Sequence, residues 1–211
     1  TSNRWGARMG DVKMLDYMLG ALHDPRLHIH MGITAENVAA RYEITREQQD
    51  AYAVQSQQRA AKAVAAGIFK DQIVPVEIKT RKGVVLFDTD EGVKADTSVD
   101  ALGKMKPAFK KEDGTVTAGN ASTLNDGAGA VVMASSEKAK ELGLKPLARL
   151  VSYGHAGVEP EYMGIGPVPA SKLALEKAGL KVSDLDLIES NEAFAAQACA
   201  VSKEMGFPND K

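Results

Sequence analysis

The sequence predicts an α/β protein in which helices pack against a layered sheet. From about residue 125 onward, β-rich apolar segments alternate with helical segments in the order strand, helix, strand, helix. Apolar residues make up 44% of the 211 residues and charged residues 26%, proportions that are typical of globular proteins and not of disordered ones. This length is enough for one large core or two smaller ones.

Charge and cysteine content exclude several kinds of function. The 26 Lys and Arg residues nearly balance 28 Asp and Glu residues, so the net charge of −2 gives no field that would gather nucleic acid or an anionic membrane. A single cysteine, Cys199, excludes an internal disulfide framework and a cysteine-cluster metal site. No apolar run approaches the ~18–20 residues of a membrane span, and the polar start is unlike a signal peptide. We therefore expect a cytoplasmic protein that binds neither nucleic acid nor membranes.

The first 120 residues are predicted to contain helices and short strands without a regular order. The clearest helix covers residues 45–66, because Thr45 and Gln48 form a capping box and Gly67 follows in the position that favours a left-handed residue. We therefore expect this half to consist of short helices and strands, without the long buried strands that form the centre of a sheet.

A hairpin is predicted after that helix. Residues 73–78 and 84–87 form two short strands, and residues 80–83 supply the turn between them. Pro75 cannot donate a ladder hydrogen bond, so the first strand is expected at a sheet edge.

The second half is predicted to alternate buried strands with helices. The active sites of such sheets lie at the carboxyl ends of strands, where the connection to the next helix begins. Three strands are predicted over residues 128–133, 148–153 and 185–189, and helices are predicted from Ser135 or Ser136 to Gly143, over residues 171–178 and from Asn191 to about Met205.

The connection around Asn191 is the first candidate for chemistry. We expect Asn191 at or next to the N-cap of its helix, where a carboxamide can bind a backbone N–H or turn its NH₂ group toward a ligand. The positive end of the helix dipole would then favour negative charge developing on a substrate oxygen. The alternative is a well-capped core helix with no catalytic role. Cys199 lies inside this helix, far from its N-terminus, and is interpreted as a buried small hydrophobe rather than a reactive thiolate.

Two further segments carry candidate residues. Residues 115–130 are rich in glycine and other small residues, which allow the backbone to approach a ligand or another backbone closely. From the residues alone we favour the alternative, a tight loop entering a buried strand. His28 and His30 could face one side of an extended segment and hold a metal, but no carboxylate stands at a ligand spacing, so we favour surface or pocket-lining groups. Thr34 is predicted to cap a short helix over residues 35–40.

Taken together, six segments resemble the thiolase family, specifically its biosynthetic acetyl-CoA acetyltransferase and β-ketothiolase group. They occur in the family's order and at about its spacing, and they span nearly all of the chain. The matching segments are HMGITAENVA (30–39), REQQDAYAVQSQQRA (46–60), KPAF (106–109), TVTAGNASTLNDGAGAVV (115–132), MGIGPVPA (163–170) and NEAFAAQACAV (191–201).

The resemblance implies a layered α-β-α-β-α fold, of which this chain is expected to hold an incomplete portion. Thiolases have two similar halves, and a loop domain inserted in the first half carries much of the coenzyme A (CoA) site and the oligomer contacts. By this resemblance, residues 1–120 correspond to the loop domain, residues 121–145 to the end of the N-terminal half and residues 146–211 to the start of the C-terminal half.

The resemblance also implies roles for individual residues. Asn191 would hold a water that helps to form an oxyanion hole for the thioester carbonyl. Lys94 falls where an arginine often meets the adenine ring in this family, and lysine stacks less well than a planar guanidinium. The other residues implied to line the acyl and pantetheine tunnel or to contact the pantetheine are Leu22, His30, Met31, Ala108, Phe109, Ala118, Ser122, Met163, Ala193 and Phe194.

Thiolases condense acetyl-CoA to acetoacetyl-CoA or another 3-ketoacyl-CoA, or cleave 3-ketoacyl-CoA by thiolysis, through an acyl-cysteine intermediate. This chain contains neither the family's nucleophilic cysteine nor its Cys-x-Gly-Gly-Gly and Gly-His-Pro segments. The resemblance therefore implies an acyltransferase as the parent protein, in fatty-acid, polyhydroxyalkanoate or ketone-body type metabolism, with the nucleophile outside this chain. CoA and acetyl-CoA would be substrates, with no tightly bound cofactor and no metal. Homo-oligomers are expected, dimeric or tetrameric with a preference for tetramer. The alternative is a non-catalytic fragment that binds CoA and oligomerises.

Overall fold

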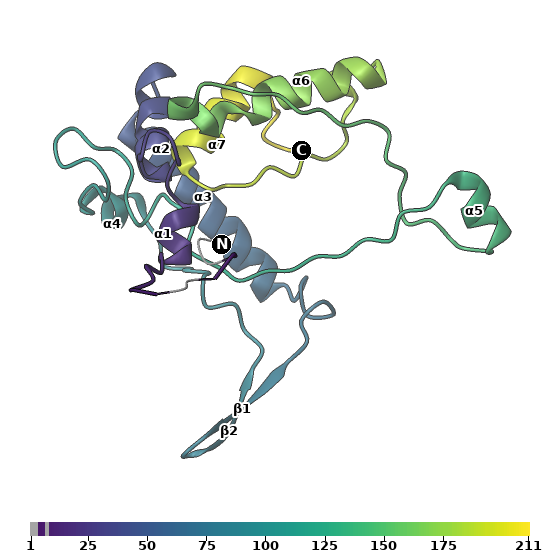
Figure 1. Cartoon of the computed structure of the whole chain (residues 1–211), viewed down its shortest axis with the longest axis horizontal. Coiled ribbons are helices and arrows are strands. Elements are labelled where there is room, and N and C mark those ends of the chain that lie inside the picture. Colours follow the sequence, from purple (N-terminus) through teal and green to yellow (C-terminus); the bar gives the residue numbers. More distant parts are fainter. Residues whose placement is uncertain (1–3, 7–8) are drawn as a thin grey trace.

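A computed structural model describes residues 4–6 and 9–211 of the chain, and a group of packed helices forms its centre (Figure 1). Helix α7 packs against α2, α3 and α6, and α2 also packs against the 3₁₀ segment η1. The α-helices are α1 (Tyr17–Ala21), α2 (Met31–Arg41), α3 (Arg46–Ala65), α4 (Val99–Gly103), α5 (Ser136–Glu141), α6 (Pro167–Ala178) and α7 (Ala195–Met205), and the 3₁₀ segments are η1 (Pro160–Ile165) and η2 (Val182–Asp184).

The core is built from small and branched side chains on the facing sides of α2 and α7. Their small size lets the helices approach closely, and Val116 from an irregular segment fills the space beside them. The buried core consists of Ala35, Val38, Ala39, Ile44, Val116, Ile165, Val168, Ala196, Ala200, Val201 and Met205.

Local capping signals set most of the helix ends. Thr45 is the N-cap of α3 and forms the predicted capping box with Gln48, in which each side chain accepts a hydrogen bond from the other residue's backbone N–H. Ser135 caps α5 as predicted, and Gly179 ends α6 in the left-handed conformation. Helix α6 begins four residues before the predicted start, because Pro167 occupies its first turn, where a missing N–H costs nothing.

The prediction that Thr34 caps a short helix is wrong. Helix α2 begins at Met31, and His30 is its N-cap, with the His30 Nδ1 atom accepting a hydrogen bond of 3.0 Å from the backbone N–H of Gly32. Thr34 lies inside the helix and donates its hydroxyl to the Met31 carbonyl oxygen. A histidine therefore supplies the acceptor that we expected from threonine.

The predicted hairpin is confirmed. Strands β1 (Val76–Thr80) and β2 (Gly83–Phe87) pair antiparallel, with Thr80 opposite Gly83. The first strand begins after Pro75 rather than at residue 73, because proline has no N–H for the ladder. The hairpin projects away from the helices (Figure 1), and both of its faces are exposed.

The three strands predicted over residues 128–133, 148–153 and 185–189 are extended segments without ladder partners; β1 and β2 form the only named sheet among the described residues. Val131 and Val132 are 85% and 97% exposed. A run that is apolar on both faces forms a strand when neighbouring strands and covering helices surround it. The described residues supply no neighbouring strands to these segments.

The prediction that Asn191 lies at the N-cap of its helix is also wrong. Helix α7 begins at Ala195, with extended Phe194 as its N-cap. A short antiparallel contact explains the delay: Ser122 N–H donates to the Ala193 carbonyl at 3.0 Å, and Ala195 N–H donates to the Asn120 carbonyl at 2.9 Å. These two bonds hold the chain extended for longer than its local sequence indicates.

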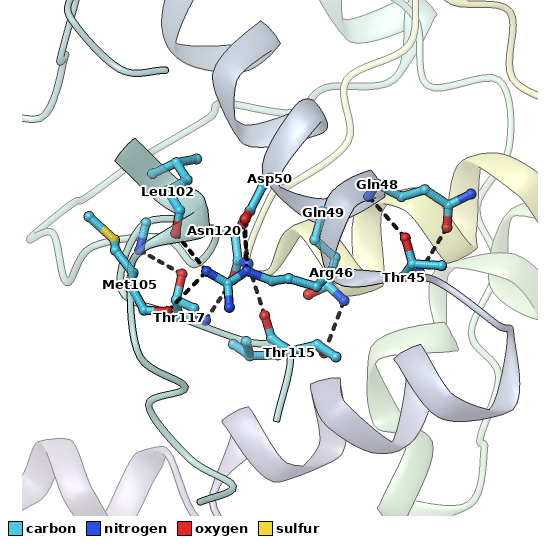
Figure 2. Close-up of polar contacts among 12 residues, drawn as sticks. Thr45, Arg46, Gln48, Gln49, Asp50, Leu102, Met105, Thr115, Thr117 and Asn120 are labelled. Atoms are coloured by element: carbon cyan, nitrogen blue, oxygen red, sulfur yellow. Dashed lines mark hydrogen bonds and ion pairs between the residues drawn. The ribbon is translucent and has the colours of Figure 1, made fainter. Parts of the chain in front are cut away.

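A buried polar network fixes residues 115–120 to the first turns of α3 (Figure 2). Asn120 donates from Nδ2 to Asp50 Oδ1 at 2.9 Å and to the Thr115 carbonyl at 3.0 Å, and its Oδ1 accepts the Thr117 N–H at 2.7 Å. Arg46 binds Asp50 Oδ2 at 2.8 Å and reaches the Leu102 carbonyl with another nitrogen. One carboxylate thus joins α3, the end of α4 and the loop before Ala121.

We expect Asn120→Ala to lower the free energy of unfolding of the chain by about 2–3 kcal/mol, because Asp50 and the Thr117 N–H would remain buried with fewer partners. Chemical denaturation monitored by circular dichroism measures this change. Asn125→Ala, at an exposed position in the following loop, is the matched control and should change stability by less than about 0.5 kcal/mol. Equal stability of the two variants would contradict the role of the network.

Candidate active site

Two clefts meet at Asn191. The first has a volume of about 1130 Å³ and the second about 690 Å³, and Asn191 lines both of them together with Glu189 and Ser190. Volumes of about 300–1,000 Å³ are usual for small-molecule sites, so each cleft is large enough for part of a long ligand. A side chain at their meeting point can contact groups that enter from either side.

The first cleft is more polar and is lined by α3, residues 118–125 and the loop of residues 189–192. Three of the predicted binding residues, Lys94, Ala118 and Ser122, line it. The Lys94 backbone N–H donates to Gln57 Oε1 at 2.8 Å, and the Lys94 ammonium donates to the Glu91 carbonyl at 2.8 Å. These bonds hold the segment after the hairpin against α3.

The second cleft is mainly apolar and lies against α2, α6 and α7. Five of the predicted tunnel residues line it, so the structure brings together residues from four separate parts of the chain. They are Leu22, Met31, Met163, Ala193 and Phe194.

An aromatic row connects α2 with the start of α7. The His30 ring stacks on Phe109 with centroids 4.7 Å apart, and Phe109 meets Phe194 edge-on at 6.2 Å. Gly32 allows this arrangement, because a Cβ atom there would lie 2.3 Å from Phe109 ring carbons. Ala108, which was predicted to contact pantetheine, is exposed and lines neither cleft, although its N–H donates to the Val116 carbonyl and so sets the position of Phe109.

The surroundings of the His30 imidazole disfavour its protonated form. Burial, assisted by the nearby ring of His23, lowers the pKa of His30 below its ordinary value of 6.5. The rings of His23 and His30 lie edge-on with centroids 4.9 Å apart. Since Nδ1 accepts the Gly32 N–H, the neutral ring carries its proton on Nε2, which leaves that nitrogen as a hydrogen-bond donor.

The prediction that Cys199 is not a reactive thiolate agrees with its surroundings. Burial, with a contribution from the charge of Glu192, raises the pKa of the Cys199 thiol to about 11. The side chain is half-buried inside α7, so it is less enclosed than predicted. In the part of the chain that the structure describes, no group of three or more His, Cys, Asp or Glu residues could hold a metal ion, and no helix is long and apolar enough to span a membrane.

Sequence reasoning missed a group of polar residues in the first cleft. Glu192 accepts hydrogen bonds from Tyr52 Oη at 2.9 Å and from Ser56 Oγ at 2.5 Å. Tyr52 and Ser56 are four residues apart on α3 and therefore share a face, which was the one available signal. Burial, and then the hydrogen bond to Glu192, raise the pKa of the Tyr52 phenol, so it remains a donor at neutral pH.

Family comparison agrees with this arrangement. The family model described as thiolase, N-terminal domain, matches residues 1–137, and the model described as thiolase, C-terminal domain, matches residues 144–211. The chain belongs to the thiolase family, and the predicted thiolase-like α/β fold class is confirmed.

Named relatives and solved structures agree with that assignment. The chain is 67% identical to beta-ketothiolase BktB of Cupriavidus necator, covering 96% of this chain and 52% of the relative. It is 59% identical to an acetyl-CoA acetyltransferase of Chromobacterium violaceum, covering 99% and 54%. The crystal structure of Bacillus anthracis acetyl-CoA acetyltransferase superposes with a TM-score of 0.86 at 52% identity, over 100% of this chain and 53% of that one.

A CoA complex is among the similar structures. Human mitochondrial 3-ketoacyl-CoA thiolase in complex with CoA has a TM-score of 0.83 at 46% identity, over 97% of this chain and 51% of that one. The chain thus spans about half the length of the relatives it matches.

We expect Gly32→Ala to destabilise the chain by about 1–3 kcal/mol, because the added methyl group would force the Phe109 ring away from His30 and Phe194. Urea denaturation measures the loss, and near-ultraviolet circular dichroism reports the displaced aromatic row. Gly20→Ala in α1 is the matched control, since a Cβ there meets no atom within 4 Å. Equal stability of both variants would show that the close approach at Gly32 is not needed.

Stability should fall as the pH drops below 6.5. The folded state disfavours protonated His30, whereas the unfolded chain protonates near pH 6.5, so protons stabilise the unfolded state below that pH. The stability that neutral His30 contributes to the free energy of unfolding is present above pH 6.5. It is lost as the pH falls from 6.5 toward the lowered pKa of His30 in the folded state. His30→Asn keeps an N-cap acceptor that does not titrate in this range. Denaturation midpoints at pH 5 to 7.5 should vary less in this variant; an unchanged pH dependence would contradict the role of His30.

Proposed function

We propose that the whole protein transfers acyl groups between CoA thioesters, condensing two acetyl-CoA molecules to acetoacetyl-CoA or cleaving 3-ketoacyl-CoA. The position of Asn191 where the two clefts meet carries this proposal. A long ligand could lie in the polar cleft and place its reacting end beside Asn191, with the apolar cleft lined by the acyl-contact residues. The names of the relatives and the match of both thiolase family models support the same activity.

The proposed chemistry places a covalent step outside this chain. A cysteine thiolate attacks the carbonyl of one acyl-CoA, the CoA thiolate leaves, and the acyl group remains on the cysteine. A second acetyl-CoA loses an α-proton to a base, and its enolate carbon attacks the acyl-enzyme, which expels the cysteine thiolate and gives 3-ketoacyl-CoA. We assign neither the nucleophile nor the base to Cys199, because burial raises the pKa of its thiol to about 11.

Asn191 is proposed to hold a water that stabilises the thioester oxygen as it gains negative charge. Its side chain is exposed at the meeting of the clefts, so its NH₂ group is accessible to a ligand or a water. A preorganised donor contributes most where charge develops in the transition state. Asn191 precedes the start of α7 by four residues. The proposed oxyanion role therefore depends on the Asn191 carboxamide and not on the dipole of α7.

Of the remaining predicted residues, three line the polar cleft and five line the apolar cleft, whereas His30, Ala108 and Phe109 line neither. We propose that Lys94, Ala118 and Ser122 contact the nucleotide and pantetheine parts of CoA, with Ser122 donating or accepting a hydrogen bond. The aromatic row and the apolar cleft would border the pantetheine and acyl groups, through His30, Met31, Leu22, Phe109, Met163, Ala193 and Phe194. Ala108 would act by placing Phe109, since it is exposed outside both clefts.

We also propose roles for the segments of the chain, an oligomeric state, a location and a metabolic context. Residues 1–120 would act as the loop domain that binds CoA and joins subunits, in a cytoplasmic homo-oligomer, with tetramer preferred to dimer. Residues 121–145 and 146–211 would belong to the two thiolase halves. The likeness to beta-ketothiolase BktB supports a role in making or cleaving 3-ketoacyl-CoA. The proposed context is fatty-acid, polyhydroxyalkanoate or ketone-body type metabolism.

In the full-length protein, Asn191→Ala should lower kcat for acetoacetyl-CoA thiolysis by ~10²–10³-fold through lost oxyanion stabilisation. Absorbance of the magnesium enolate of acetoacetyl-CoA follows the reaction. Asn209→Ala, which changes an exposed residue outside both clefts, is the matched control and should keep normal turnover.

Near-normal turnover of Asn191→Ala would contradict the proposed oxyanion role. A full-length protein that binds CoA but shows no thiolysis and no condensation would instead favour the alternative of a non-catalytic CoA-binding protein.

A further inference from the structure

The carboxylate of Glu192 attaches the loop beside Asn191 to α3. Its two oxygens accept separate hydrogen bonds, one from Tyr52 Oη and one from Ser56 Oγ, across 140 and 136 residues of sequence. The two hydroxyl donors lie one helical turn apart on α3, and each reaches a different oxygen of the carboxylate. Glu192 itself is exposed, so these bonds contribute little to global stability and act mainly on the local position of the loop.

The other side of the same loop is attached through its main chain. Ala193 accepts a hydrogen bond from Ser122 N–H, and Ala195 donates one to the Asn120 carbonyl. Glu192, next to Asn191, is therefore held by its side chain, whereas Ala193 and Ala195 are held by their backbone. The Asn191 side chain is exposed at the meeting of the clefts, and it forms no hydrogen bond with any residue that the structure describes.

We propose that Glu192 is a positioning residue for the acyl-transfer reaction: Tyr52 and Ser56 hold its carboxylate, and the fixed Glu192 backbone aims the Asn191 carboxamide at the reacting thioester. This inference rests on the proposed function of Asn191. It assigns no contact between Glu192 and the substrate. Without the carboxylate, Asn191 would sample several orientations, and displacements of about 1 Å at a reacting centre can cost up to ~10²-fold in rate.

A double-mutant cycle on the full-length protein tests this coupling. Glu192→Ala should lower kcat by ~10–10²-fold while the KM for acetoacetyl-CoA changes by less than about 3-fold, because binding contacts are kept and transition-state stabilisation is lost. Asn191→Ala/Glu192→Ala should be as slow as Asn191→Ala alone, because Glu192 then has no carboxamide to position. Glu204→Ala, which removes an exposed carboxylate from α7, is the matched control and should retain normal kcat.

A second variant keeps the carboxylate and removes its donors. Tyr52→Phe/Ser56→Ala deletes two hydroxyl groups with little change in volume and should reproduce the loss in kcat of Glu192→Ala. Glu192→Gln, which keeps one carbonyl acceptor, should recover part of the activity. Thermal unfolding followed by circular dichroism establishes that each variant is folded.

The outcomes separate this inference from the proposed function. If the losses of Asn191→Ala and Glu192→Ala multiply in the double variant, or if Glu192→Ala raises KM and leaves kcat unchanged, Glu192 acts independently and the inference fails while Asn191 keeps its role. If Asn191→Ala alone turns over normally, the oxyanion role fails and the positioning role of Glu192 fails with it.

Discussion

The buried hydrogen bond between Asp50 and Asn120 is the constraint on which the site depends. Asp50 is 2% exposed and Asn120 3% exposed, so neither can exchange its partner for bulk water without opening the fold. Arg46 neutralises the same carboxylate and carries the contact to the Leu102 carbonyl (Figure 2). Because the Asn120 carbonyl also binds the Ala195 N–H, this one buried pair sets where α7 begins and where the preceding loop runs.

The site combines a rigid support with an accessible reacting edge. Main-chain bonds from Asn120 and Ser122 fix residues 193–195, which are buried or half-buried, whereas Asn191 remains exposed to both clefts. Glu192 is intermediate between the fixed residues 193–195 and the exposed Asn191. Its carboxylate is hydrogen-bonded to α3, while the residue itself is accessible to solvent. The proposed reaction of a long, flexible thioester requires such an arrangement, since the donor has to be fixed while its surroundings admit the ligand.

Features encoded by neighbouring residues could be predicted from the sequence, and features that depend on distant partners could not. The capping box of Thr45 and Gln48 needs only a few adjacent residues, so the start of α3 was evident. The strands predicted over residues 128–133 and 148–153 need paired strands on both sides, and the described residues provide none. Asn191 was misplaced relative to α7 because the bonds that delay the helix come from Asn120 and Ser122. The contribution of Glu192 was missed for the same reason, since its donors lie 136 and 140 residues away. The candidate CoA-contact residues were suggested by the motifs, whereas the fold was needed to show that eight of them line two different clefts and that His30, Ala108 and Phe109 line neither.

A crystal structure of the full-length protein with an acyl-CoA bound would test the role of Asn191 most directly. We expect the pantetheine to lie along Ala118 and Ser122, and the thioester oxygen to face the Asn191 carboxamide directly or through one water. Glu192 should keep both hydrogen bonds to α3. A thioester bound away from the meeting of the two clefts, with Asn191 turned from it, would contradict the central claim that this loop is built to stabilise the reacting oxygen.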